Sequence, residues 1–380
     1  MRVFLVAGEA SGDRLGAALM GGLRTLCPDV KFLGVGGPQM EGQGLRSLFP
    51  MDELSVMGIA EVLPRYPHLR RRMFQTADAV LSERPDVLIG IDSPDFCLRV
   101  AKRVRASSDT RIVHYVAPSV WAWRPGRAAK MARHVDHVLA LLPFEPPYME
   151  AAGMRCDFVG HPVVSDPVAT EDGIAAFRMA HDLGDDPYLL VLPGSRRSEV
   201  ERLAPVFGAA LRKMGKTPRV VIPVAPGREE MLRSLTADWP ATRLLEHPDP
   251  GQKAAAFAGA HAALAASGTV SLELAAAATP MVVAYDMSWL SWQIMSRMAL
   301  IDTVTLVNLI EGTKVVPELL GPACRPDAIA AALTDLWDAP DRQGAALART
   351  MTALGQGGEA PGLRAARAVI DGLASPRDPV

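Results

Sequence analysis

The stretch YLLVLPGSRRSEVE, residues 188–201, decides the fold expected for the second half of the chain. Its first five residues are apolar, which is typical of a parallel strand buried on both faces. Gly194 then allows close approach to the backbone, the first amides of a following helix lack partners, and Arg196 can bind two phosphate oxygens. The stretch therefore predicts either a phosphate-binding loop or a helix start capped by a serine such as Ser195.

A second loop of small residues, 267–269, follows an expected strand at 262–265 and opens another helix. Glu273 lies in that helix, where a carboxylate needs hydrogen-bond donors such as a pair of ribose hydroxyls. Two loops of this kind in one domain favour phosphate binding over simple capping. Asn308 offers a donor and an acceptor for a base or an amide, and fits a turn equally well.

Strands and helices alternate along all 380 residues, which is too long for one core and predicts two α/β domains with parallel sheets. A polar, turn-rich segment at 165–187 marks the boundary. We expect an N-terminal domain at 1–165, a C-terminal domain at 166–345 and a helical tail at 346–380 that packs back across the seam. The expected strands are residues 2–7, 31–35, 87–91, 111–116, 135–142, 188–192, 219–224, 242–245, 262–265 and 281–285.

The loop after the first strand carries Glu9, Ser11 and Asp13. Its glycine spacing is not the dinucleotide-binding fingerprint, and its two carboxylates would repel a pyrophosphate. We therefore expect the loop to line a cleft toward a neutral or hydroxyl-rich ligand. A turn in which Ser11 caps the helix is an equally good interpretation.

The apolar strand at 87–91 places Asp92 at its carboxyl end, where ligands bind in open α/β sheets. A partly desolvated carboxylate there could accept a proton from a substrate hydroxyl. Asp95 could serve instead, and either residue could cap the next helix, but Asp92 is the candidate base. After the strand at 111–116, Trp123 and Arg124 could stack on a ring or hold a phosphate, or simply anchor the loop.

Composition excludes some functions. A net charge of −2 argues against bulk attraction to nucleic acid, and the four cysteines lack the spacing of a zinc site or a redox pair. The N-terminal residues predict a strand rather than a signal peptide. Residues 54–72, an apolar segment ending in three arginines, fit either a core-facing helix with a solvated face or the interface of an anionic membrane. The sequence by itself favours the first of these.

Nine blocks of the sequence, in order, resemble the lipid-A-disaccharide synthase family, inverting GT-B glycosyltransferases of family 19. The set covers nearly the whole chain and is far more specific than any single block. The blocks are LVAGEASGD (5–13), LSVMGIAEVLP (54–64), IGIDSPDF (89–96), HYVAPSVWAWRPGR (114–127), LLPFEP (141–146), FVGHP (158–162), LPGSRRSEV (192–200), SGTVSLE (267–273) and NLI (308–310).

The resemblance implies two Rossmann-like domains facing a cleft. It implies a transfer from UDP-2,3-diacylglucosamine to 2,3-diacylglucosamine 1-phosphate that gives a β-1,6 disaccharide and UDP, with no cofactor or metal. It also implies a cytoplasmic enzyme that is peripheral on the inner face of the inner membrane, and it allows a homodimer. A lipid-handling surface thereby becomes the better interpretation of 57–72. A UDP-N-acetylglucosamine 2-epimerase-like enzyme and a non-catalytic nucleotide-sugar-binding regulator are the alternatives.

Roles follow from the resemblance for the matching residues. Asp92 would be the base, with Asp95 as its alternative. The donor side would comprise Gly194, Ser195, Arg196, Ser267, Gly268, Thr269, Glu273 and Asn308, and the cleft and acceptor side Glu9, Ser11, Asp13, Met57, Trp123 and Arg124. This chain departs from the family pattern at Gly321, often a glutamine, and at Asp286, commonly a basic residue.

Overall fold

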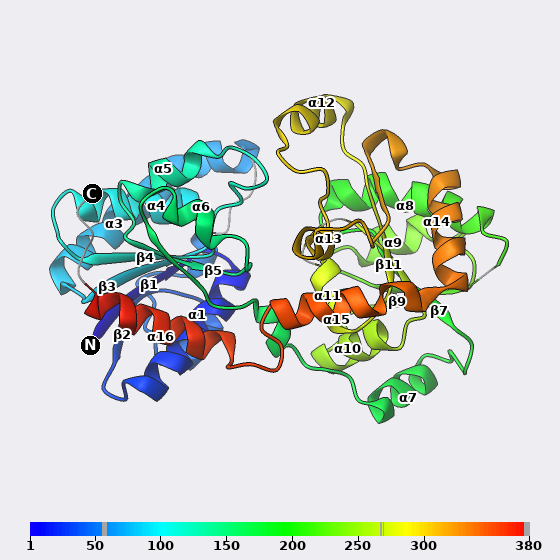
Figure 1. Ribbon diagram of the computed structural model, residues 1–380, viewed down its shortest axis with the longest axis horizontal. Helices are drawn as coiled ribbons and strands as arrows, with labels where there is room; N and C mark the ends of the chain where they lie inside the picture. The colour runs from blue at the N-terminus through cyan, green and yellow to red at the C-terminus, as the bar shows by residue number, and fades with distance from the viewer. Residues whose placement is uncertain (55–58, 217, 267, 269, 376–380) are drawn as a thin grey trace. The chain divides into compact units, whose positions relative to one another are not determined.

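The computed structural model describes residues 1–54, 59–216, 218–266, 268 and 270–375. The chain divides into two compact units, Met1–Pro162 with Gly357–Val380, and Val163–Gln356 (Figure 1). Each unit is an α/β fold around its own parallel sheet, which confirms the predicted fold class. Of the candidate site residues, Met57, Ser267 and Thr269 lie outside the described ranges.

The first unit contains a six-stranded sheet in the order β2-β1-β3-β4-β5-β6. Its strands are β1 (Arg2–Ala7), β2 (Lys31–Val35), β3 (Val87–Ile91), β4 (Arg111–Tyr115), β5 (His137–Ala140) and β6 (Arg155–Phe158). Its helices are α1 (Ala10–Leu26), α2 (Pro38–Gly42), α3 (Ile59–Glu83), α4 (Pro94–Arg105), α5 (Gly126–Ala132), α6 (Pro146–Glu150) and α16 (Pro361–Ala374).

Both faces of this sheet are covered, because successive side chains of a strand point to opposite faces. In β1, Phe4 and Val6 pack with residues of α3, α4 and α5, whereas Val3 and Leu5 pack with residues of α1 and α16. The C-terminal helix α16 lies against α1 (Figure 1). A Cβ atom on Gly22 would come within 2.5 Å of the Gly362 carbonyl oxygen, so the two helices approach closely at glycine.

The second unit contains a six-stranded sheet in the order β12-β11-β10-β7-β8-β9, with α8 and α14 packed on one face. Its strands are β7 (Tyr188–Leu192), β8 (Arg219–Pro223), β9 (Thr242–Leu245), β10 (Ala262–Ala265), β11 (Met281–Tyr285) and β12 (Glu318–Leu320). Its helices are α7 (Glu171–Ala180), α8 (Arg197–Lys213), α9 (Glu229–Leu235), α10 (Pro250–Ala258), α11 (Val270–Ala276), α12 (Trp289–Met298), α13 (Leu306–Glu311), α14 (Pro326–Asp338) and α15 (Gly344–Ala353).

The expected strands are all present, and two further ones, β6 and β12, were not predicted. The strand expected at 135–142 is shorter, since β5 covers only His137–Ala140. Within the ranges that the structure describes, no helix combines the length and the apolar character needed to cross a bilayer.

Candidate active site

The candidate ligand-binding residues follow the strands at which each sheet reverses its order. From β1 the chain passes to β2 on one side and then to β3 on the other, and from β7 it passes to β8 and later to β10 on the opposite side. Open α/β sheets bind ligands beyond the carboxyl ends of the two strands at such a switch point. Glu9 and Asp92 follow β1 and β3, the loop 193–196 follows β7, and Ala266 follows β10.

Asp92 lies half-buried directly after β3. Its backbone N–H donates to the Tyr115 carbonyl oxygen at 2.9 Å, and the Ser11 hydroxyl donates to Asp92 Oδ2 at 3.4 Å. The structure therefore brings two of the predicted residues together at the switch point. Neither Asp92 nor Asp95 caps α4, whose N-cap position is occupied by Ser93.

Backbone strain is concentrated at the carboxyl edge of the first sheet, after β3 and β4. Of the nine non-glycine residues with positive φ in the described part of the chain, four lie here: Asp92 (52°), Ser93 (40°), Val116 (86°) and Arg124 (51°). A positive φ is most costly for a β-branched residue such as Val116. Strained residues persist only where their surroundings fix them, and they cluster at ligand sites.

A pocket of about 430 Å³ opens beside this edge of the first sheet. Its apolar wall includes Leu54, Leu69, Met73 and Phe96, and its charged groups are Glu9, Arg70, Asp95 and Arg99. The pocket thus joins the loops after β1 and β3 to helix α3, and combines a large apolar surface with charges of both signs.

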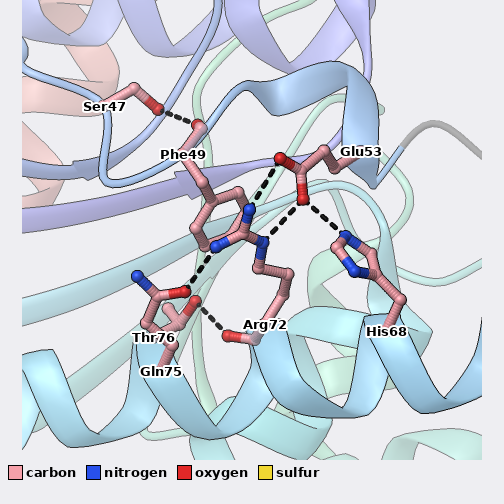
Figure 2. A network of polar contacts seen from close by, with 7 residues as sticks. All are labelled: Ser47, Phe49, Glu53, His68, Arg72, Gln75 and Thr76. Atoms are coloured by element: carbon pink, nitrogen blue, oxygen red, sulfur yellow. Dashed lines mark hydrogen bonds and ion pairs between the residues drawn. The ribbon is translucent and has the colours of Figure 1, made fainter.

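An ion-pair network connects Glu53 to α3 (Figure 2), and its residues are chain neighbours of Leu54, Leu69 and Met73, which line the pocket. Arg72 of α3 donates to both carboxylate oxygens of Glu53, from Nε at 2.6 Å and Nη2 at 2.7 Å, and it packs over the Phe49 ring. His68 Nε2 lies 2.5 Å from the same carboxylate. The hydrogen bonds from Arg72 hold the pKa of Glu53 at about 2. The Arg72 side chain therefore stabilises the fold. Of the described arginines at 70–72, only Arg70 lines the pocket.

Asp13 does not line the cleft as expected, because it is only 2% exposed. Its carboxylate accepts the backbone N–H groups of Gly37, Gln39 and Met40 at 2.9 to 3.0 Å, at the start of α2. Ser11 is not the helix cap either, since Glu9 occupies the N-cap position of α1. Asp13 therefore connects α1 to the start of α2 and stabilises the fold there, and it is not available to a ligand.

The tryptophan-containing loop 116–125 is held by a residue that was not predicted from the sequence. Arg124 lies over the Trp123 ring at 4.3 Å, while Trp121 donates from Nε1 to Glu145 Oε1 at 3.2 Å. Glu145 also accepts the backbone N–H groups of Leu141 and Leu142. It is 4% exposed, and burial raises its pKa to about 7. A charged residue inside the apolar LLPFEP block was the signal available in the sequence.

On the donor side, Gly194 has φ of 108°, and a Cβ atom there would lie 2.7 Å from Glu199 Oε2. Only glycine fits this turn. Arg196, not a serine, is the N-cap residue of α8, and Glu199 accepts both its backbone N–H at 3.3 Å and its guanidinium at 2.8 Å. The Arg196 side chain remains 65% exposed. Arg228, which was not predicted, donates to the Ser195 carbonyl oxygen.

Two other donor-side residues have partners within the protein. Lys253 lies 2.8 Å from Glu273. Asn308 is 1% exposed, and its side chain both donates to the carbonyl and accepts from the N–H of Val316, each at 2.9 Å. The amide nitrogen and the amide oxygen of Asn308 thus both bind within residues 308–316. This corrects the expectation that Asn308 recognises a base. Gly268 has φ of 128°, and no atom of the residues that the structure describes lies within 4 Å of a Cβ placed there.

The two departures from the family pattern also have structural counterparts. Gly321 has φ of 52°, and a Cβ atom there would lie 2.5 Å from the Trp292 ring. Asp286 forms an ion pair with Arg202 at 3.5 Å. Among the residues that the structure describes, no cluster of three or more His, Cys, Asp or Glu side chains is arranged to hold a metal ion.

Two Rossmann-like units with candidate residues at both switch points define the GT-B class, and solved structures agree. UDP-GlcNAc 2-epimerase from Neisseria meningitidis, solved with UDP-GlcNAc, matches with a TM-score of 0.67 at 12% identity, over 98% of this chain and 100% of that one. MurG from Acinetobacter baumannii matches with a TM-score of 0.56 at 16% identity, over 97% and 98%. At such identities the likeness shows the fold alone.

Sequence relatives identify the family within this class. The family model described as lipid-A-disaccharide synthetase matches residues 3–358. The lipid-A-disaccharide synthase of Ruegeria pomeroyi is 64% identical over 98% of this chain and 96% of its own length, and that of Rhodospirillum centenum is 49% identical over 97% and 94%. The chain belongs to the lipid-A-disaccharide synthase family and is a glycosyltransferase. The resemblance seen in the sequence is confirmed, and neither alternative function is favoured.

Proposed function

We propose that this enzyme joins UDP-2,3-diacylglucosamine to 2,3-diacylglucosamine 1-phosphate, forming the β-1,6-linked disaccharide 1-phosphate and releasing UDP. The observation that carries the proposal is Asp92, a carboxylate on a backbone of positive φ at the β1/β3 switch point, in a member of this family and beside a largely apolar pocket. In the reaction the acceptor 6-hydroxyl oxygen attacks the anomeric carbon, the bond to UDP breaks, and the configuration inverts.

Asp92 accepts the proton of the attacking hydroxyl, because it lies on the strand end where ligands bind and is only partly solvated. The Ser11 hydroxyl beside Oδ2 orients the carboxylate. Asp95, which lines the pocket, is the alternative base.

The loop 193–196 binds the diphosphate of UDP. Backbone amides at the start of α8 favour an anion, and the exposed guanidinium of Arg196 can exchange Glu199 for phosphate oxygens. Arg228 adds a second positive charge at Ser195. Glu273 accepts the ribose hydroxyls after it separates from Lys253. The leaving group departs as an anion, so these groups stabilise the charge that develops in the transition state.

The pocket beside β3 holds acyl chains of a lipid substrate. Leu54, Leu69, Met73 and Phe96 supply its apolar wall. Arg70 and Arg99 lie at the same pocket and suit the 1-phosphate of the acceptor. In this arrangement the acyl chains contact the apolar wall of the pocket, and the 1-phosphate contacts its arginines.

We further propose that the enzyme docks on an anionic membrane surface at the inner face of the inner membrane. Five of the ten exposed large apolar side chains in the described residues lie on or just after α12: Trp289, Ile294, Met295, Leu300 and Val304. Residues 287–301 contain no carboxylate and one arginine, Arg297. Exposed apolar groups with tryptophan and arginine fit the interface of an anionic bilayer.

Vesicle sedimentation tests this docking surface. Serine at Trp289 and Leu300 should reduce binding to phosphatidylglycerol vesicles, whereas serine at Val168 and Met179, which are exposed elsewhere in the same unit, should not. Equal binding by both variants would reject the surface. If light scattering shows a dimer that the first variant dissociates, then a second copy of the chain covers α12 instead.

Incubation of purified enzyme with both acylated substrates tests the reaction itself. UDP release together with a disaccharide 1-phosphate in the product mass spectrum is the expected result. Turnover of a UDP-sugar without any acceptor would indicate an epimerase, and tight UDP binding without turnover would indicate a regulator.

A further inference from the structure

The buried carboxylate of Glu145 has no part in the transfer described above, yet it connects two loops at the catalytic edge of the first sheet. One loop, 116–125, leads from β4 to α5, and the other, 141–145, leads from β5 to α6. Glu145 Oε1 accepts from Trp121 Nε1 at 3.2 Å, and Oε2 accepts from the N–H groups of Leu141 and Leu142 at 3.1 and 3.0 Å. One side chain therefore satisfies three donors from both loops.

The tryptophan is held from a second side as well. Its ring meets that of Phe144 edge to face, with centroids 5.1 Å apart and planes at 89°. A buried carboxylate with three N–H donors is much harder to displace than a solvated one, because breaking its bonds leaves buried polar groups unpaired. Trp121 is thereby fixed relative to β5.

The connection reaches the candidate base through the backbone. Asp92 N–H donates to the carbonyl oxygen of Tyr115, and the next residue, Val116, has φ of 86° and donates its own N–H to Leu139. The loop held by Trp121 begins at this strained residue and carries Trp123 and Arg124. Any loosening of the loop would allow Val116 to relax and would change the position of Asp92.

We propose that Glu145 is a positioning residue for the transfer reaction, whose ionised carboxylate ties the tryptophan-containing loop to the strand end beside Asp92. The role of Glu145 in the reaction rests on the proposed function, whereas its hydrogen bonds to the two loops are present in the free enzyme. Protonation removes acceptor capacity from a carboxylate that faces three donors. The hydrogen bonds of Glu145 to Trp121, Leu141 and Leu142 therefore weaken at acid pH.

The surroundings of Glu145 indicate that its carboxylate titrates within a pH range in which the enzyme can be assayed. Burial raises its pKa to about 7, while the three hydrogen bonds act in the opposite direction. Cys156 of β6 is affected by the Glu145 charge: its pKa is raised by burial and by the charges of Glu145, Asp157 and Glu150, so that the thiol stays neutral. Among the residues that the structure describes, no arginine or lysine shifts the pKa of Glu145.

Tryptophan fluorescence tests the tie without substrate. The wild-type spectrum should change with a midpoint near pH 7, and the change should be absent in both Trp121→Phe and Glu145→Gln. Its persistence in Glu145→Gln would overturn the proposal. This measurement does not depend on the identity of the substrates.

Kinetics test the positioning role. Trp121→Phe keeps an aromatic ring next to Phe144 but removes the N–H donor together with part of the indole ring. We expect the variant to have kcat lowered on the order of tenfold with the donor KM unchanged, as for a misplaced reacting group. In Glu145→Gln the acid limb of kcat near pH 7 should disappear. Full activity of Trp121→Phe, or an unchanged acid limb in Glu145→Gln, would overturn the role even when the wild type performs the proposed transfer.

Discussion

The carboxyl edges of the two sheets are built in opposite ways. At the first edge, buried carboxylates fix the loops: Asp13 and Glu145 are 2% and 4% exposed and accept three N–H donors each. At the second edge, the candidate ligands Arg196 and Glu273 lie in partly exposed ion pairs on the protein itself. The difference indicates a rigid edge that positions reacting atoms and an adaptable edge that exchanges internal ion pairs for a charged ligand.

The largest effect should come from the chemistry assigned to the first edge. Asp92→Asn removes the proton acceptor, and we expect kcat to fall by about 10² or more, the usual scale for a lost general base. UDP binding by the second unit should persist, which isothermal titration can measure. An unchanged rate would place the base at Asp95 or elsewhere.

The rigidity of the first edge can be tested by stability. Asp13→Asn replaces an acceptor-only carboxylate with a group that presents N–H donors to buried backbone N–H groups, so we expect the free energy of unfolding to fall by about 2 kcal/mol. Urea unfolding followed by circular dichroism measures this. Glu41→Gln, a surface carboxylate of the adjacent α2, is the matched control and should change little. A stable Asp13 variant would remove the main evidence that this edge is rigid.

The adaptability of the second edge can be tested with a pair of neighbouring arginines. Arg196→Ala should raise the donor KM about tenfold, since one charge-assisted phosphate contact is lost. Arg197→Ala is the control, because Arg197 is paired with Glu201 one turn along the surface of α8. Equal effects of the two substitutions would mean that only general positive charge matters at this loop.

The fold on which this contrast stands could largely be predicted from the sequence, because strand positions and glycine turns are local properties. The central strands β1, β3 and β7 appeared at their observed bounds, since each is a continuous apolar run. The edge strands β6 and β12 were missed, because an edge strand is partly solvated and its residues, such as RCDF in β6, form no apolar run.

The partners of polar side chains could not be predicted in the same way. Asn308 binds Val316, and Trp121 binds Glu145, 24 residues further along the chain, and nothing in either local sequence specifies the partner. The location of the site was predictable from strand ends, whereas its polar contacts depend on tertiary packing.

The smallest expected effect concerns Asp286, which stands where the family commonly has a basic residue. Its ion pair with Arg202 spans 3.5 Å between side chains that are 31% and 43% exposed, so Asp286→Asn should change the free energy of unfolding by less than about 0.5 kcal/mol. The substitution releases Arg202 of α8 and removes a negative charge from the carboxyl end of β11, so the donor KM should fall by about twofold. Steady-state kinetics at low and high salt measure this, and the effect should shrink as salt screens the charges. A donor KM that rises would show that the ion pair positions α8 for UDP, and the second edge would then be less adaptable than its exposed ion pairs indicate.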